Sequence, residues 1–217
     1  MVKESANELV NKELRTLINF PLLSMEEIFH ICGFNDETKK KMNRIVMIMK
    51  TCKAGAKHHG AYEGGLFDHT YLICCYAKYL LDSLKADLNQ KFLLRACFYH
   101  DFGKIIIHPN KKISELQALF VDEENRETLN NLAFMIEQNT GYTLPPYLIG
   151  PDTYEHTLKT LLILHNMGFR EHPEIIKAIM FHHGGWSDFK REGRVDSTKY
   201  SAILHSADGI ISQVLKI

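Results

Sequence analysis

Apolar residues recur three and four positions apart along most of the chain, a spacing that gathers them on one face of an α-helix. This pattern predicts helices over residues 6–18, 25–34, 38–49, 66–84, 89–100, 127–138, 153–167, 173–183 and 197–215. Stretches rich in glycine and proline separate them, such as "GAYEGG" and "TGYTLPPYLIGP". Residues 104–108, "KIIIH", have the composition of a short strand, but no alternating segment offers a partner strand. The expected fold is therefore a single all-α domain.

Composition and charge place the chain among ordinary globular proteins. The net charge is zero with histidine neutral, so no overall field attracts nucleic acid or an anionic membrane. The polar opening "MVKESANELVNKEL" excludes a secretory signal, and no apolar run reaches the roughly 20 residues that span a bilayer. Five cysteines without a CxxC pair indicate reduced core residues rather than disulfides or a cysteine zinc site. We therefore expect a cytoplasmic protein that does not contact membranes.

Histidine is the unusual component, because there are twelve and they gather at a few places. Residues three, four and seven apart share one face of a helix. On this basis, five predicted helices each carry a potential metal ligand on the apolar face, namely His69, His100, His156, His183 and Asp208. Two of these positions are extended by an adjacent metal-capable residue, Asp101 beside His100 and His182 beside His183.

Each of these histidines, taken alone, is better explained as a hydrogen-bonded core residue than as a ligand. The aspartates differ, because a carboxylate on an apolar face is costly to bury unless it is paired or bound to a metal. Five such positions, two of them doublets, make five independent structural explanations improbable. The residues therefore indicate one shared metal site.

The order of these residues and the local sequence around each of them resemble the HD-domain superfamily of metal-dependent phosphohydrolases. The resemblance is carried by "GGLFDHT", "YHDFGK", "HHGG" and "LHSADGI", and it covers about residues 58–212. It implies an HD-domain helical bundle with the metal site among its central helices. In this interpretation, residues 1–57 are an N-terminal helical segment packed on the core and residues 58–217 are the HD domain. Residues 109–150 are then a family-variable insertion within it.

The resemblance also implies a further histidine roughly two dozen residues before the pair at His182 and His183. His156 lies at that distance, whereas His165 lies nine residues later in the same predicted helix and therefore on its opposite face. We select His156 as the ligand and interpret His165 as a surface or structural residue. The other histidines outside the motifs are interpreted as structural, or at most as supporting the site: His30, His108, His172 and His205.

The resemblance and the ligand types together imply a site for two divalent ions. The minimal one-metal set is His69, His100, Asp101 and Asp208. His156, His182 and His183 supply donors for a second ion, with Asp101 as the bridge. Candidate ions for imidazole and carboxylate ligands are manganese, iron, nickel, zinc and magnesium. The implied chemistry is attack of a bridging hydroxide on a phosphoryl group, with Asp101 and Lys104 as the catalytic residues. Lys104 is expected to reach a substrate phosphate; the alternative is a helix-terminal charge that complements the helix dipole.

The substrate is indicated by residues beside the first ligand helix. Residues 39–59 hold seven basic residues and no acid, and they end in His58 and His59. They are either a solvated face or a surface that attracts phosphate, with Lys104, His58 and His59 as substrate-binding candidates. The segment "HHGAYEGGLFDHT" is similar to HD domains of 3′–5′ exoribonucleases and conjugative relaxases. This similarity implies a nucleotide or single-stranded nucleic acid as the phosphate-ester substrate. Tyr62, Phe67 and Trp186 are candidates for base stacking and equally for packing.

The leading prediction is a metal-dependent phosphohydrolase, specifically a phosphodiesterase, nuclease or nucleotidase. Two alternatives stay open. The same fold and ligand types support a di-iron oxygenase, which would consume oxygen without cleaving a phosphate ester. The other alternative is a metal-binding regulatory domain without turnover.

Overall fold

Helices are the only regular elements in the residues that this computed structural model describes, which are 18–56, 60–107, 126–143, 156–184 and 197–217. The all-α prediction is confirmed over these residues. In chain order the helices are α2 (Met25–Ile31), α3 (Asp36–Met49), α4 (Gly65–Ser83), α5 (Gln90–Tyr99), α6 (Lys104–Ile107), α8 (Arg126–Thr140), α9 (His156–Asn166), α10 (Pro173–Met180) and α11 (Lys199–Gly209). A π-helix, η4 (Ile210–Val214), directly continues α11.

Several helices begin where a polar side chain caps the first turn. Ser24 and Glu27 form a reciprocal capping box at the start of α2, and Thr198 takes part in a similar box at the start of α11. Asn35 and Asn89 each accept a hydrogen bond from a backbone N–H in the first turn of α3 and α5. These side chains satisfy amide groups that no carbonyl within the helix reaches.

The observed helix ends differ from the predicted ones near the candidate site. The helix predicted over 173–183 ends at Met180, so His182 and His183 lie in the turn that follows. The helix predicted over 197–215 changes to π geometry two residues after Asp208. Residues 104–107 form the short helix α6 rather than a strand. The helix predicted over 6–18 lies outside the described residues except for its last position.

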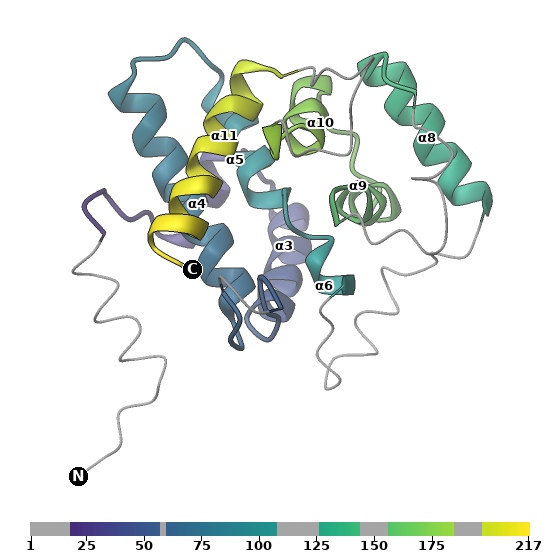
Figure 1. Cartoon of the computed structure of the whole chain (residues 1–217). Coiled ribbons are helices and arrows are strands. Elements are labelled where there is room, and N and C mark those ends of the chain that lie inside the picture. The colour runs from purple at the N-terminus through teal and green to yellow at the C-terminus, as the bar shows by residue number, and fades with distance from the viewer. Residues whose placement is uncertain (1–17, 57–59, 108–125, 144–155, 185–196) are drawn as a thin grey trace.

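The core lies between α4 and the helices around it. α4 packs against α5 and α11, and α5 packs in turn against α10 (Figure 1). Tyr99 and Phe102 are fully buried there. α2 packs on α5 and α3 on α4, and their residues Ile28 and Met42 belong to the same hydrophobic cluster. The division between residues 57 and 58 stays a prediction, as does the insertion over 109–150, of which only 126–143 is described.

A buried polar network anchors α5, the helix that ends at His100. Nη1 of Arg95 donates to both carboxylate oxygens of Glu171, at 3.1 and 2.8 Å, and Nε donates to the carbonyl oxygen of Cys32 at 2.7 Å. The Tyr99 hydroxyl donates to the same carboxylate at 3.1 Å. The Glu171 side chain is only 4% exposed. The network therefore ties α5 to the end of α2 and to the segment before α10.

The cysteines and the helix lengths bear on two further expectations. All five cysteines are buried and free, as expected of reduced core residues. Burial raises the pKa of Cys32 to about 12, so this thiol is unreactive in the folded protein. Among the described helices, none is both long enough and apolar enough to cross a bilayer.

Candidate metal centre

The structure brings the seven predicted ligands to one place from five segments. His69 lies on α4, His100 and Asp101 lie where α5 ends, and His156 is the first residue of α9. His182 and His183 follow α10, and Asp208 lies on the last turn of α11. Three subsets each have one ligand atom per residue within 4.8 Å of the others: His69–His100–Asp208, His100–Asp101–His182 and His156–His182–His183. Because these subsets share members, the seven side chains form one continuous cluster.

Two of the histidines end the helices that carry them. His100 is the C-cap of α5, and its Nδ1 donates to the carbonyl oxygen of Cys97 at 2.7 Å. His182 follows α10 in the same way, and its Nδ1 donates to the carbonyl oxygen of Ile179 at 2.6 Å. Each acceptor lies three residues back, among the carbonyls that a helix end leaves without an intrahelical partner. Each side-chain bond gives one of these carbonyls a partner and orients the imidazole.

His69 is oriented by a distant part of the chain. Its Nδ1 donates to the backbone oxygen of Ile217 at 2.8 Å, across 148 positions of sequence. Ile217 is 4% exposed and follows Lys216, whose backbone is left-handed with a φ of 58°. His69, His100 and His182 therefore all donate Nδ1–H to a backbone oxygen. In the neutral form of each ring, the lone pair is on Nε2, the nitrogen that metal sites of this kind use.

Asp101 lies at the centre of the cluster and is 1% exposed. Its Oδ2 lies 3.3 Å from Nε2 of His69, 3.3 Å from Nε2 of His100 and 2.7 Å from Nζ of Lys104. Its Oδ1 lies 3.3 Å from Nε2 of His156. The two oxygens of one carboxylate therefore face two different sets of imidazoles, an arrangement that suits a bridging ligand.

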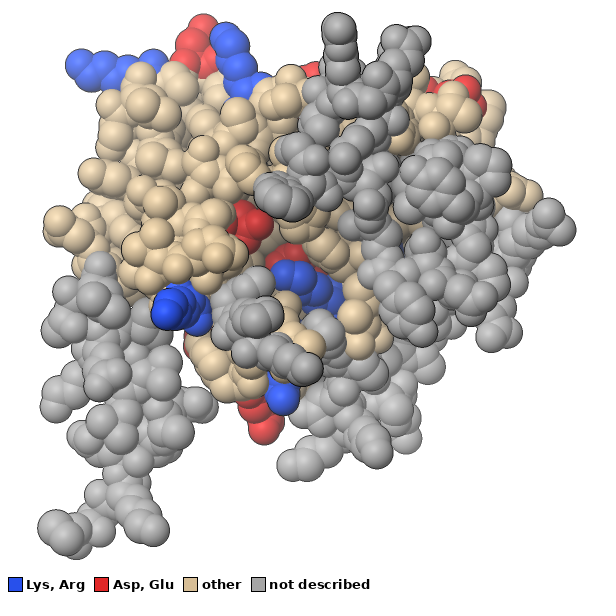
Figure 2. Space-filling view, viewed as in Figure 1, with Lys and Arg blue, Asp and Glu red and all other residues tan. Residues whose placement is uncertain are grey.

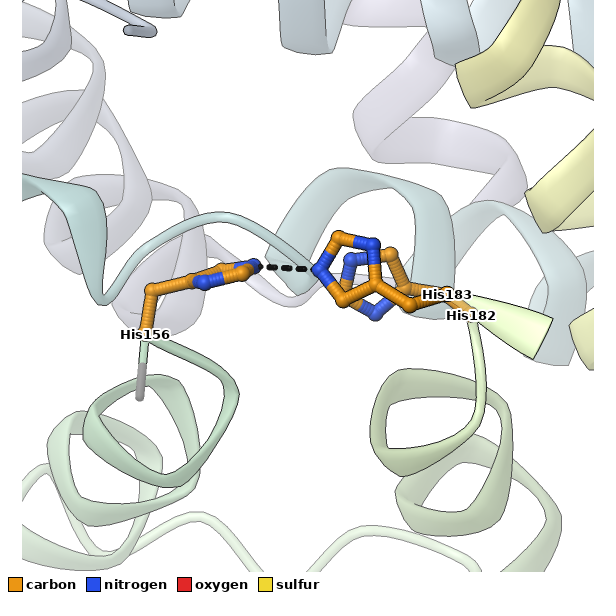
Figure 3. A group of neighbouring side chains, drawn as sticks. All are labelled: His156, His182 and His183. Atoms are coloured by element: carbon orange, nitrogen blue, oxygen red, sulfur yellow. Dashed lines mark hydrogen bonds between the residues drawn. The ribbon is translucent and has the colours of Figure 1, made fainter. Parts of the chain in front are cut away.

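His156, His182 and His183 form the second set of imidazoles (Figure 3). The rings of His156 and His183 point toward each other, and their Nε2 atoms lie 2.9 Å apart. The ring centroids of His182 and His183 lie 3.9 Å apart. His182 is fully buried and His183 partly so.

The prediction that His183 lies on the apolar face of a helix is wrong. α10 ends at Met180, and Phe181 leaves the helical conformation with φ −109° and ψ 13°. His183 reaches the cluster from the following turn, and the buried member of the doublet is His182. Gly184 continues this turn with a φ of 55°, a conformation that favours glycine.

Burial is the largest influence on the imidazoles. It lowers the pKa of His156 to about 3, and it also lowers the pKa of His182 and His183. These three rings are therefore neutral at physiological pH and require no proton loss to bind a metal. Burial would lower the pKa of His69 as well, but hydrogen bonds to Asp101 and Asp208 outweigh it and raise the pKa to about 9.

The two carboxylates are held in the ionised form. Burial alone would raise the pKa of Asp101, but electrostatic interactions with His100 and Lys104 outweigh it and hold that pKa well below its usual range. Burial would also raise the pKa of Asp208, and its hydrogen bond to His69 reverses the shift. The cluster therefore combines ionised carboxylates with mostly neutral imidazoles.

The donor set fits divalent metal ions. Nε2 of His100, Nε2 of His182 and Oδ1 of Asp101 are buried, and the described part of the chain gives them no hydrogen-bond partner. An unsatisfied buried polar atom costs about 1–3 kcal/mol. Metal coordination satisfies such atoms, and imidazole with carboxylate suits borderline divalent ions.

Lys104 opens α6, and its Nζ donates to Asp101 Oδ2. Figure 2 shows acidic and basic side chains together in a central hollow of the displayed face. The Lys104 side chain is 14% exposed, so its ammonium group lies at the cluster rather than on the outer surface. Its contact with substrate stays a prediction.

The basic run over 39–59 divides into two parts. Lys39 pairs with Glu26 and Lys41 pairs with Glu37 at 3.2 Å, which favours a solvated, ion-paired face for this end. Lys50 instead lies with its Nζ 4.8 Å from the centre of the Phe67 ring, near the start of the helix that carries His69. His58, His59 and Trp186 lie outside the described residues, so their predicted roles stay predictions.

The aromatic candidates have partners of their own. The Phe67 ring is stacked with Tyr71, with centroids 5.9 Å apart. The Tyr62 hydroxyl donates to Asp68 Oδ2 at 2.8 Å. These contacts favour packing over base stacking for both residues.

The remaining described histidines have contacts that account for them. His172 caps α10 and stacks on Phe92 with ring centroids 4.3 Å apart, and Nδ1 of His165 lies 3.3 Å from Nη1 of Arg170. His30 is exposed on the last turn of α2. His205 donates from Nδ1 to the carbonyl oxygen of His182 at 2.7 Å, so it supports the doublet. His108 lies outside the described residues.

Sequence reasoning missed two contributors to the site. One is the backbone oxygen of Ile217, whose contact with His69 cannot be inferred from residue type, because every residue has a backbone oxygen. The hydroxyl of Thr160, which contacts the backbone at Gly103 and His100, had one available signal, a threonine on the same helix face as His156.

A comparison with protein families matches residues 66–211 to the HD domain. This range covers well over half of the chain and includes all seven clustered side chains. Comparisons with curated proteins and with solved structures give no match. The chain therefore belongs to the HD-domain superfamily of metal-dependent phosphohydrolases, as the sequence resemblance predicted.

Proposed function

We propose that this protein is a phosphodiesterase that binds two divalent ions and acts on nucleotides or single-stranded nucleic acid. One observation carries the proposal. Two buried imidazoles, those of His69 and His100, lie 3.3 Å from one oxygen of the Asp101 carboxylate, and His156 lies 3.3 Å from the other. A carboxylate between two sets of imidazoles is the ligand arrangement that a pair of ions requires.

The residues divide the work. His69, His100 and Asp208 would hold one ion, and the set of His156, His182 and His183 would hold the other, with Asp101 available to both. Bound divalent ions supply Lewis acidity and a water-derived nucleophile at neutral pH. Burial of Asp101 strengthens its electrostatic interactions, because the surroundings have a lower effective dielectric than water.

Lys104 is the residue that we expect to bind the phosphate group. Its ammonium lies 2.7 Å from Asp101 Oδ2. With the negative charge of Asp101 neutralised by bound ions, this ammonium would be able to contact a phosphoryl oxygen and stabilise the charge that develops there. Lys50, which lies on the Phe67 ring beside the ligand helix, is the described member of the basic run best placed to attract a second phosphate.

The test pairs elemental analysis with manganese-dependent hydrolysis of bis-p-nitrophenyl phosphate. We expect two ions per chain, and we expect Asp101→Asn to lower the rate by at least about 10²–10³-fold. Asp82→Asn is the control, because Asp82 is an exposed carboxylate on the helix of His69 and pairs only with Lys78 among the described residues. Equal rates in the wild type and in Asp101→Asn would contradict the proposal.

Two other outcomes would favour the alternatives. Bound iron with oxygen consumption and no ester cleavage would favour the oxygenase. Tight metal binding with neither activity would favour a regulatory domain. If the diester is cleaved, single-stranded oligonucleotides and nucleoside monophosphates compared under the same conditions identify the substrate class.

A further inference from the structure

Thr160 makes two hydrogen bonds at the point where two ligand-bearing segments meet. It lies on α9, four residues after His156, and is fully buried. Its Oγ1 accepts from the backbone N–H of Gly103 at 2.8 Å and donates to the carbonyl oxygen of His100 at 3.0 Å. One hydroxyl therefore binds both ends of the turn that contains Asp101.

Gly103 allows this approach. A Cβ at this position would lie 1.9 Å from the carbonyl oxygen of His156 and 2.9 Å from the backbone nitrogen of Thr160. Both are backbone atoms, which cannot move aside as the end of a flexible side chain can. The first turn of α9 therefore rests directly on the turn over residues 100–103, and the glycine is required by this contact.

This joint, the contact between the first turn of α9 and the turn over residues 100–103, sets the distance between the two sets of imidazoles. The turn carries His100 and Asp101, whereas α9 carries His156. His156 Nε2 lies 3.3 Å from Asp101 Oδ1 and 2.9 Å from His183 Nε2. A shift of α9 away from the turn would separate His156 from the carboxylate without displacing His69, His100 or Asp208.

We infer that Thr160 and Gly103 are positioning residues that complete the second metal set by holding His156 against Asp101. The inference rests on the proposed two-ion site, but it concerns which contacts assemble that site and not the reaction. It predicts that the ion held by His69, His100 and Asp208 is bound without the joint, and that the second ion depends on it.

The test replaces Thr160 with valine, which keeps the branched shape and removes the hydroxyl. Thr157→Val is the matched control, because Thr157 lies on the same helix, is equally buried, and has a hydroxyl without a hydrogen-bond partner among the described residues. Thr160→Ser restores a hydroxyl at the same position. Manganese per chain and the electron paramagnetic resonance spectrum, which distinguishes a coupled ion pair from isolated ions, are measured on all four proteins.

We expect the wild type, Thr157→Val and Thr160→Ser to show the coupled pair. In Thr160→Val, we expect the second ion to bind about 10–100-fold more weakly, as is typical when a residue that orients a ligand is lost. Wild-type affinity for both ions in Thr160→Val would overturn the inference, and so would a wild type that never takes up a second ion. A lost pair in Thr160→Val, together with no ester cleavage by the wild type, would uphold the inference and refute the proposed function.

Discussion

Replacing Lys104 with methionine tests how the cluster balances its charge without a metal. The Lys104 ammonium lies 2.7 Å from Asp101 Oδ2, and the two side chains are 14% and 1% exposed. Methionine keeps an apolar stem of similar length and removes the charge. The substitution therefore leaves a buried carboxylate with the imidazoles as its remaining partners.

The expected magnitude follows from this burial. Removing one partner of a buried ion pair costs about 3–5 kcal/mol. We expect about 3 kcal/mol, the lower end of that range, because His69, with its pKa of about 9, still brings a positive charge to Asp101. In a protein of this size, that loss corresponds to a fall in Tm of about 6–12 °C. With manganese bound, the ion supplies the missing positive charge, and the fall should be below about 4 °C.

The assay is thermal unfolding of the wild type and Lys104→Met, each with a chelator and with excess manganese. Lys78→Met is the control, because Lys78 forms an exposed pair with Asp82 and should cost at most about 1 kcal/mol in either condition. An equal loss of Tm with and without manganese would refute the reasoning. So would the absence of any loss in the metal-free protein.

Three further predictions concern pH, thiols and the α5 anchor. In the metal-free protein, the free energy of unfolding should fall as pH drops from about 6.5 toward 3, because the unfolded His156 side chain takes up a proton that the folded ring, with its pKa of about 3, does not. The free energy of unfolding should also fall as pH rises from about 6.5 through about 9, because His69 then loses the proton that its partners stabilise. Chemical denaturation across this pH range measures both slopes, and a flat profile would contradict them. Alkylation of Cys32 at pH 8 should be at least about 10³-fold slower in the native than in the denatured protein, as followed by mass spectrometry, because the thiol is buried and protonated. Arg95→Met should lower the free energy of unfolding by about 3–5 kcal/mol, since it leaves the Glu171 carboxylate buried without its cation; a loss below 1 kcal/mol in denaturant titration would show that solvent reaches Glu171.

Helix positions, and the side chains that gather in one cluster, were largely predictable from the sequence. The apolar period located α4, α5, α9, α10 and α11, because each buries one face against its neighbours. The sequence order of the histidines and aspartates also selected residues that the structure brings together, namely His69, His100, Asp101, His156, His182, His183 and Asp208. Carboxylates on apolar faces were informative because burial without a partner is unfavourable.

The details that were not predictable depend on contacts between distant segments. α10 ends at Met180, and His182 bonds back to the carbonyl oxygen of Ile179; periodicity registers neither feature. The hydrogen bond from Lys104 to Asp101, three residues earlier, depends on how the turn after α5 folds. The contact between Thr160 and Gly103 spans 57 positions, and nothing in either local sequence specifies it.

The different spans of the three Nδ1 hydrogen bonds set an order of assembly for the cluster. His100 and His182 bond to carbonyls only three residues away, so these two rings acquire their orientation as soon as α5 and α10 form. His69 bonds across 148 residues, a contact that carries a much larger loop-closure entropy and requires the intervening chain to have folded. Of these three rings, we therefore expect His69 to take its orientation last during folding, when Ile217 docks.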